Sequence, residues 1–271
     1  MTMTWKNIET YISVPSAGFL HELYKNREYP WSPLAHLRPA IEQFVAGFSN
    51  QGQITADKAI FRNKNNSLKE GSYHILKTEI LREDFVDLEL CIFISSGTMI
   101  EAGAIIKNHT IIEKNCEIRQ GAYLRGFCYI GENSVVGHTT EIKNSIFTKH
   151  VEAGHFAYIG DSIIGSFVNL GAGTKISNLE FRSLNAKMED HFPEISFKVE
   201  KQNIKTGLSK FGAIIGDGSE TGCNSVLCPF VLLEPKCWIM PNFCVTKGVY
   251  KKGTIFRYPS IKKTIDGKNF S

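Results

Sequence analysis

Polar and ionisable side chains are dense in residues 141–178 of this 271-residue chain. They supply carboxylate, amine, imidazole, phenol and amide groups, namely Glu141, Lys143, His150, His155, Tyr158, Asn169 and Asn178. Histidine titrates close to neutral pH, and its imidazole can act as a general acid or base. Arg125, slightly upstream, and Lys143 add cationic side chains. This density of polar groups makes the stretch the candidate functional site.

Each of these residues also has a structural explanation. His155 could be a corner histidine bonded to backbone, and Asn169 and Asn178 could cap turns. Tyr158 could belong to the core, and Arg125 and Lys143 could be solvated surface charges. The choice depends on the elements that position these side chains.

A six-residue repeat provides those elements. Every sixth residue is an Ile, Leu or Val at Ile94, Ile100, Ile106, Ile112, Ile118, Leu124, Ile130, Val136 and Ile142. A small residue follows four positions after each of the first eight, at Thr98, Ala104, Thr110, Cys116, Ala122, Cys128, Ser134 and Thr140. We interpret each hexad as a short strand and a turn, with three hexads to a triangular coil. The two buried cysteines are then core filler.

The repeat is interrupted twice. It resumes after the first break at Tyr158, Ile164, Leu170 and Ile176, and after the second at Ile215, Thr221, Leu227, Leu233, Ile239 and Val245. The second interruption, about residues 178–210, is charged and contains Pro193. We expect a loop that leaves the solenoid there.

The ends of the chain differ from its middle. Apolar residues at helical spacing predict a helix with Pro39 near its first turn, on Leu37, Ile41, Phe44, Val45 and Phe48. We therefore expect a partly helical capping segment over residues 1–88, which covers the open end of the solenoid. The repeat domain then takes residues 89–258, and a basic tail takes residues 259–271.

Several motifs resemble a known family. The runs E-x-K-N-S from Glu141, A-G-H-F-A-Y-I-G-D-S-I-I-G around His155, and V-N-L-G-A-G-T around Asn169 resemble the acetyltransferase half of GlmU-type proteins. The resemblance covers roughly residues 90–258. It implies a left-handed parallel β-helix, an all-β solenoid, that assembles as a homotrimer. It also implies an acetyl-CoA-dependent N-acetyltransferase that acts on glucosamine 1-phosphate or another hexosamine 1-phosphate, for UDP-N-acetylhexosamine and cell-envelope precursor synthesis in the cytoplasm.

The resemblance also implies a role for each site residue. His155 matches the general base, Glu141 a residue that supports it, and Asn178 an amide near the reacting amine. The sugar phosphate would contact Arg125 and Lys143. Further acceptor contacts would come from Tyr158 and Asn169. The coenzyme would contact Arg257, with Lys247 and Cys223 as further candidates and Lys251 and Lys252 as looser ones.

The chain departs from the family pattern in two places. Leu184 stands where a lysine is expected, and Lys187 is the nearest substitute. Residues 1–90 hold only four scattered glycines, Gly18, Gly47, Gly52 and Gly71, without a Gly-rich phosphate loop. We therefore expect no uridylyl transfer.

Two other functions remain open. One is a non-catalytic sugar-nucleotide-binding or assembly module on the same scaffold. The other is a zinc-dependent γ-type carbonic anhydrase, because His150 and His155 have the spacing of two of its ligands. The third ligand position is Lys114, and His109 and His138 are out of phase, so we expect no metal.

Composition narrows the partners. The net charge of +4 is too small to indicate a nucleic-acid partner. The seven cysteines include no C-x-x-C pair, which favours free thiols in a reducing compartment. No apolar run approaches the roughly 20 residues that span a bilayer.

Overall fold

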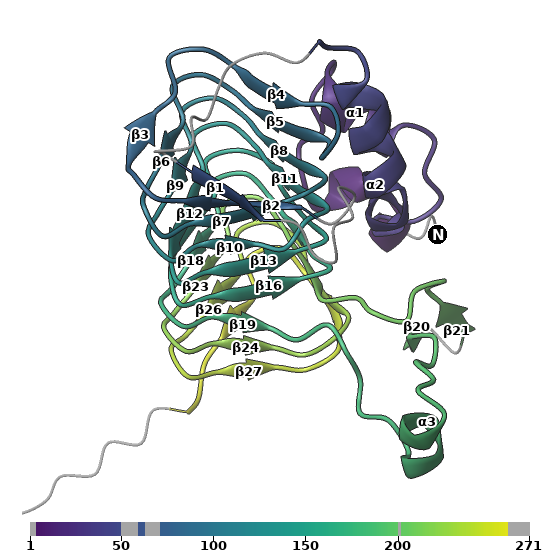
Figure 1. Ribbon diagram of the computed structural model, residues 1–271. Helices are drawn as coiled ribbons and strands as arrows, with labels where there is room; N and C mark the ends of the chain where they lie inside the picture. The colour runs from purple at the N-terminus through teal and green to yellow at the C-terminus, as the bar shows by residue number, and fades with distance from the viewer. Residues whose placement is uncertain (1–3, 50–58, 63–70, 200–201, 260–271) are drawn as a thin grey trace, which may run out of the picture.

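The computed structural model describes residues 4–49, 59–62, 71–199 and 202–259. Its body is a left-handed parallel β-helix of stacked coils, as predicted, with three nine-stranded sheets as its sides (Figure 1). The first sheet consists, in order, of β1 (Ala59–Arg62), β2 (Ser72–Ile75), β7 (Ile105–Lys107), β10 (Tyr123–Leu124), β13 (Glu141–Lys143), β16 (Tyr158–Gly160), β19 (Lys175–Ile176), β24 (Val226–Leu227) and β27 (Cys244–Val245).

The other two sides have the same number of strands. The second sheet consists of β4 (Phe85–Asp87), β5 (Ile92–Ile94), β8 (Thr110–Ile112), β11 (Cys128–Ile130), β14 (Ser145–Phe147), β17 (Ile163–Ile164), β22 (Ala213–Ile215), β25 (Val231–Leu233) and β28 (Gly248–Tyr250). The third consists of β3 (Glu79–Ile80), β6 (Met99–Ile100), β9 (Glu117–Ile118), β12 (Val135–His138), β15 (Glu152–His155), β18 (Asn169–Leu170), β23 (Glu220–Thr221), β26 (Trp238–Ile239) and β29 (Ile255–Phe256).

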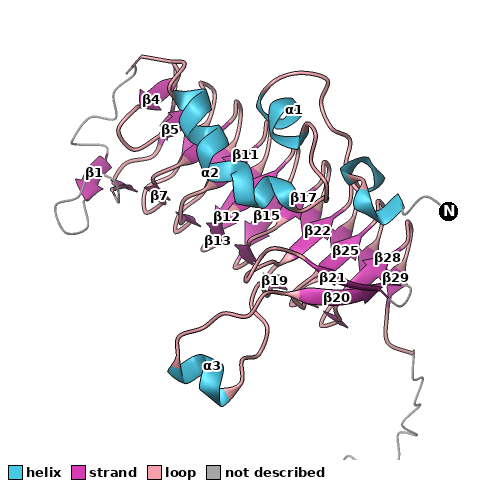
Figure 2. Ribbon diagram, turned by 90° about the vertical axis from the view of Figure 1, so that its right-hand side faces the viewer, coloured by secondary structure: helices cyan, strands magenta, loops and turns pink. Residues whose placement is uncertain are grey.

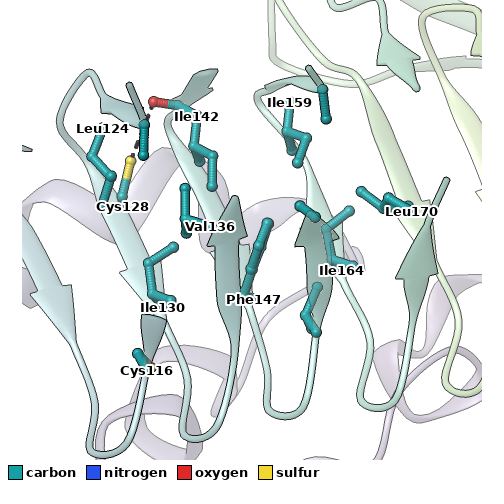
Figure 3. Packing of buried hydrophobic residues seen from close by; sticks show 14 of the residues in the cluster. Cys116, Leu124, Cys128, Ile130, Val136, Ile142, Phe147, Ile159, Ile164 and Leu170 are labelled. Carbon is teal, nitrogen blue, oxygen red and sulfur yellow. Dashed lines mark hydrogen bonds between the residues drawn. The ribbon is translucent and has the colours of Figure 1, made fainter. Parts of the chain in front are cut away.

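The predicted large and small positions fill the interior of this prism. All nine aliphatics from Ile94 to Ile142 are buried, as are the eight small residues from Thr98 to Thr140 (Figure 3). Burial raises the pKa of both the Cys116 and Cys128 thiols to about 12. Both cysteines therefore act as apolar filler, as predicted.

The first break in the repeat is a shortened step, and it corrects one prediction. Ile142 is followed in the core by Phe147, five residues later, and Ile159 by Ile164 in the same way. Ile159, not Tyr158, is the buried partner of Ile142. A constant six-residue step before Ile164 puts Tyr158 in the large-residue series, which left a core position open as one of its two interpretations. Its side chain instead lies on the outer face of the first sheet and is only partly buried.

The N-terminal segment packs along one side of the prism. It contains the 3-10 turns η1 (Thr4–Lys6) and η2 (Ile8–Thr10) and the helices α1 (Phe19–Tyr24) and α2 (Ser32–Val45). Figure 2 shows the helices lying across the second sheet. Leu37 and Ile41 belong to the same buried cluster as the outward-facing Phe93, Ile111 and Ile146 of that sheet.

Two expectations about this segment change. The helix begins at Ser32 with Pro33 in its first turn, so Pro39 lies in the interior of α2. The described helices cover a side of the prism, whereas β2, β3 and β4 run antiparallel to strands of the first coil. The large apolar residues on the outer face of the second sheet explain this position, because they need a partner that excludes water.

The second interruption is an arm between β19 and β22. It contains α3 (Leu184–Met188) and the hairpin of β20 (Ser196–Val199) and β21 (Gln202–Lys205), and α3 projects away from the solenoid (Figure 1). The pairing of strands in the second sheet is not interrupted by the arm, because Ile164 of β17 pairs directly with Ile215 of β22. Most of the tail expected at residues 259–271 lies outside the described residues. No helix in the described part of the chain is long and apolar enough to span a membrane.

Candidate functional site

A column of polar side chains follows the outer face of the first sheet. Tyr123, Glu141, Tyr158 and Lys175 are register partners on β10, β13, β16 and β19. Successive residues of a strand face opposite sides, so the next residue of each strand points into the core. Burial of these aliphatic neighbours therefore holds the polar residues in line on the surface.

Arg125 and Glu141 form an ion pair at the end of the column next to Tyr123. Arg125 Nη1 donates to Glu141 Oε1 over 2.5 Å, and both side chains are more than a third exposed. The hydrogen bond that Arg125 donates to Glu141 raises the pKa of the guanidinium further above neutrality. Lys143 follows Glu141 on the same strand, next to Gly160 of β16. An anion bound here would contact two cations, Arg125 and Lys143. It could replace Glu141 as the hydrogen-bond acceptor of the Arg125 guanidinium.

Tyr158 and Asn178 form a second cluster on the next coils. Burial, then the negative charges of Asp161 and Glu141, raise the pKa of Tyr158, while Arg125 and a hydrogen bond from Asn178 oppose the rise. A Cβ at Gly160 would lie 2.7 Å from Asn178 Nδ2 and 2.8 Å from the Tyr158 hydroxyl. Only glycine leaves room for this contact.

His155 ends β15, at the corner between the third and first sheets. Its imidazole is exposed, and its ring centroid lies 6.4 Å from that of Phe156. Within the described residues, no side chain hydrogen-bonds to this ring, and Glu141 pairs with Arg125 instead. The structure therefore places His155 at the edge of the polar column, open to solvent.

A second imidazole lies directly beside it. His138 and His155 are register partners on β12 and β15. The expectation that His138 is out of phase is wrong, because the coil between them has 17 residues rather than 18. His138 Nδ1 donates to the Gln120 carbonyl over 2.9 Å, and its ring packs edge-on against Phe156.

The remaining predicted residues lie apart from this column in a single chain. Asn169 is exposed on the third sheet beside Glu152. Lys187 is exposed on α3, where Leu184 is also exposed. Asn169 therefore lies on a different side of the prism from Tyr158, and Lys187 lies on the arm, outside the column.

The coenzyme candidates are also dispersed. Arg257 follows β29 of the third sheet and is exposed, and Cys223 is exposed in the turn after β23. Lys247 pairs with Glu180 and the Ser196 carbonyl, which ties the arm to the last coils. Its ammonium is therefore already engaged within the chain.

Two polar residues at this place were not singled out from the sequence. Asp161 is 5% exposed and accepts hydrogen bonds from Asn144 and Asn178. Lys175 donates to the carbonyls of Phe156 and Gly173, and burial lowers its pKa. The signal for Asp161 was its spacing, 17 residues from each asparagine, which a strict six-residue step conceals.

The histidine pair of the zinc alternative does not converge. His150 lies at the corner between the second and third sheets, where its ring stacks on Phe167 at 4.7 Å. His155 lies at the next corner of the same coil. Among the described residues, no group of three or more His, Cys, Asp or Glu side chains could hold a metal ion.

Comparison with known proteins supports the repeat directly. Residues 109–144 match the model "Bacterial transferase hexapeptide (six repeats)". The chain is 32% identical over 180 residues to a bifunctional sugar-1-phosphate nucleotidylyltransferase/acetyltransferase of Sulfurisphaera tokodaii, covering 60% of this chain and 43% of that protein. It is 30% identical over 201 residues to the bifunctional protein GlmU of Methanococcus aeolicus, covering 72% of this chain and 46% of that protein.

A third relative matches over a shorter range. The GlmU protein of Methanococcus vannielii is 35% identical over 136 residues, covering 50% of this chain and 30% of its own length. The chain thus spans less than half the length of these relatives. The resemblance that the motifs indicated is confirmed: the solenoid is built from hexapeptide repeats of the bacterial transferase type and is similar to part of GlmU-type proteins.

Proposed function

We propose that the chain is an acetyl-CoA-dependent N-acetyltransferase of a hexosamine 1-phosphate, with glucosamine 1-phosphate as the first candidate. The observation that carries the proposal is the exposed imidazole of His155 at the edge of a surface that also holds Arg125, Glu141 and Tyr158. This surface offers a proton acceptor next to cations that suit a phosphate. One relative is named a bifunctional sugar-1-phosphate nucleotidylyltransferase/acetyltransferase, and its acetyltransferase part agrees with this chemistry.

In the proposed reaction His155 accepts a proton from the sugar amine as the nitrogen attacks the thioester carbonyl, because an ammonium is not nucleophilic. Arg125 and Lys143 hold the phosphate, and the phosphate replaces Glu141 as the acceptor of the guanidinium. Tyr158 and Asn178 contact the acceptor sugar. Acetyl-CoA supplies the activated acyl group when it is bound.

We place the remaining candidate residues in a homotrimer. Asn169 and Arg257 belong to the third sheet and its end, off the face that carries Tyr158, so a neighbouring copy would bring them and Lys187 of its arm to the same cleft. Cys223 lies at the corner between the third and first sheets of the same chain, as His155 does. Lys247 keeps its contact with Glu180 in this proposal. The reaction would supply UDP-N-acetylhexosamine and envelope precursor synthesis in the cytoplasm, and no uridylyl transfer is expected.

A thiol-release assay tests the function. Purified protein receives acetyl-CoA and either glucosamine 1-phosphate, galactosamine 1-phosphate or unphosphorylated glucosamine. Free coenzyme A should appear at once with one or both of the amino-sugar phosphates and more slowly without the phosphate. Absence of release with any of them, from protein whose folding is verified by circular dichroism, favours the non-catalytic binding module.

Two side reactions separate the alternatives. Formation of UDP-sugar and pyrophosphate from UTP and a sugar 1-phosphate would contradict the expected lack of uridylyl transfer. Hydration of carbon dioxide by zinc-loaded protein would favour the carbonic anhydrase. His150 and His155 lie at different corners of one coil, so they do not share one metal within a chain.

A further inference from the structure

A ladder of three side chains crosses the corner between the first and second sheets. Asn144, Asp161 and Asn178 follow one another on successive coils, 17 residues apart. Asn144 Nδ2 donates to Asp161 Oδ1 over 2.8 Å, and Asn178 Nδ2 donates to Asp161 Oδ2. Asp161 is 5% exposed, so both of its oxygens are satisfied within the protein.

The carboxylate fixes the orientation of the Asn178 amide. An ionised carboxylate only accepts hydrogen bonds, whereas an amide group has a donating and an accepting end. Asn178 must therefore turn its Nδ2 toward Asp161, and the same nitrogen donates to Tyr158. The Oδ1 of Asn178 is left as an acceptor, and it has no partner among the described residues.

The backbone around the ladder keeps it in place. The Asp161 amide donates to the Lys143 carbonyl over 2.9 Å, and the Asp161 carbonyl accepts from Gly212 over 2.9 Å. The Asn178 carbonyl accepts from Phe211 over 2.9 Å. Asp161 has a left-handed φ of 49°, a conformation that Asp tolerates better than most residues. The ladder thus joins the coils on both sides of the arm.

We propose that Asp161 is a positioning residue that makes the site selective for an amine acceptor over a hydroxyl acceptor, by holding the Oδ1 of Asn178 toward the acceptor. This inference rests on the proposed function. An amine or ammonium needs an acceptor for its hydrogens. A sugar hydroxyl both donates and accepts, so it can be satisfied by either end of the Asn178 amide.

The test substitutes Asp161→Asn, which keeps the shape and removes the charge. An Asn at this position can donate as well as accept, so Asn178 is free to turn. The KM for glucosamine 1-phosphate should rise about 10- to 100-fold, the scale of a charge-assisted hydrogen bond. The KM for acetyl-CoA should stay within about twofold, because the coenzyme does not contact this amide.

A ligand without the amine separates positioning from general damage. Glucose 1-phosphate, which carries a hydroxyl in place of the amine, serves as a competitive inhibitor. Its Ki should change by less than about twofold in Asp161→Asn. Equal weakening of glucose 1-phosphate and glucosamine 1-phosphate would overturn the inference, and so would unchanged binding of both.

Asn144→Ser is the matched control. It removes the other hydrogen bond to Asp161 and leaves Asn178 in contact with the carboxylate. Thermal stability should fall in this variant while the preference for the amine persists. A loss of preference in Asn144→Ser as large as in Asp161→Asn would show that the ladder acts only through stability. If the wild-type protein transfers no acetyl group to any amino sugar, the proposed function fails. If the wild-type protein is active and Asp161→Asn keeps its preference for the amine, only this inference fails.

Discussion

At the scale of single residues, the two neighbouring imidazoles have different restraints. His138 is held by the Gln120 carbonyl and by Phe156, whereas His155 has, among the residues that the structure describes, a ring contact with Phe156 alone. A base that must take and release a proton needs an accessible ring. The accessible ring of His155 suits the proposed base, and the restrained ring of His138 provides the control.

His155→Ala should therefore lower kcat for acetyl transfer by about 10² to 10⁴, the usual contribution of a general base. His138→Ala removes an imidazole from the adjacent coil at the same register position and should change kcat by less than about fivefold. Steady-state kinetics of thiol release measure both. Equal losses in the two variants would mean that the corner needs both rings for its shape, and an unchanged rate in His155→Ala would remove this residue from the mechanism.

Part of this site could be predicted from the sequence. Arg125, Glu141, Tyr158 and Asn178 were named from residue type and family resemblance, and the structure brings them onto one face. Asp161 was not named, because a buried carboxylate is recognised by its partners, which lie one coil away in either direction. The predicted support of His155 by Glu141 also depends on a side-chain orientation, and Glu141 is turned toward Arg125 here.

At the scale of the elements, the hexad spacing predicted most of the residues that fill the interior of the prism, but not the second buried cluster beneath the N-terminal segment. It could not predict the shortened steps, because the length of a step is set at the corner. The left-handed residue at a corner does not mark the shorter step, because the five-residue corner after Ile142 has one, Asn144, and the six-residue corner after Ile106 also has one, His109. The sequence therefore does not reveal which corner drops a residue.

The arm is held at its base by a buried tryptophan. Trp31 Nε1 donates to the Thr206 carbonyl over 3.0 Å, and its ring lies edge-on to Phe197 of β20 at 6.0 Å and to Phe230 at 5.3 Å. The N-terminal segment therefore fixes the position of the hairpin of β20 and β21. This contact connects the N-terminal segment to the arm, which lies 175 residues further along the chain.

Trp31→Phe should loosen the arm, since phenylalanine keeps an aromatic ring and removes the donor. We expect a loss of about 2 kcal/mol or more in the free energy of unfolding, because the variant removes one hydrogen bond and leaves a cavity where the larger buried ring was. Amide hydrogens of residues 196–199 should exchange faster, while those of β11 and β14 should keep their protection. The same acceleration in the conservative control Phe44→Leu, which lies elsewhere in the N-terminal segment, would show general destabilisation instead.

At the scale of the whole molecule, the three sides of the prism have different surroundings. The second sheet is covered by the N-terminal segment, while the first and third sheets present Tyr158 and Asn169 to solvent. The third sheet also exposes Trp238 and Ile255 as register partners, each 51% accessible. The proposed acceptor contacts are thus divided between two open sides, and one chain cannot direct both at one ligand.

A homotrimer would bring the first sheet of one copy next to the third sheet of another. Sedimentation equilibrium should give a mass of three times 30.4 kDa, or about 91 kDa. Dilution to concentrations at which the trimer dissociates should lower the activity per chain in parallel with the mass, because each site would lose the residues that a neighbouring copy supplies. The exposed Trp238→Ser variant should shift this dissociation to higher concentration, whereas Lys149→Ser, at the corner next to the covered side, should not. Full activity per chain at a mass of 30.4 kDa would mean that a single copy contains the complete site.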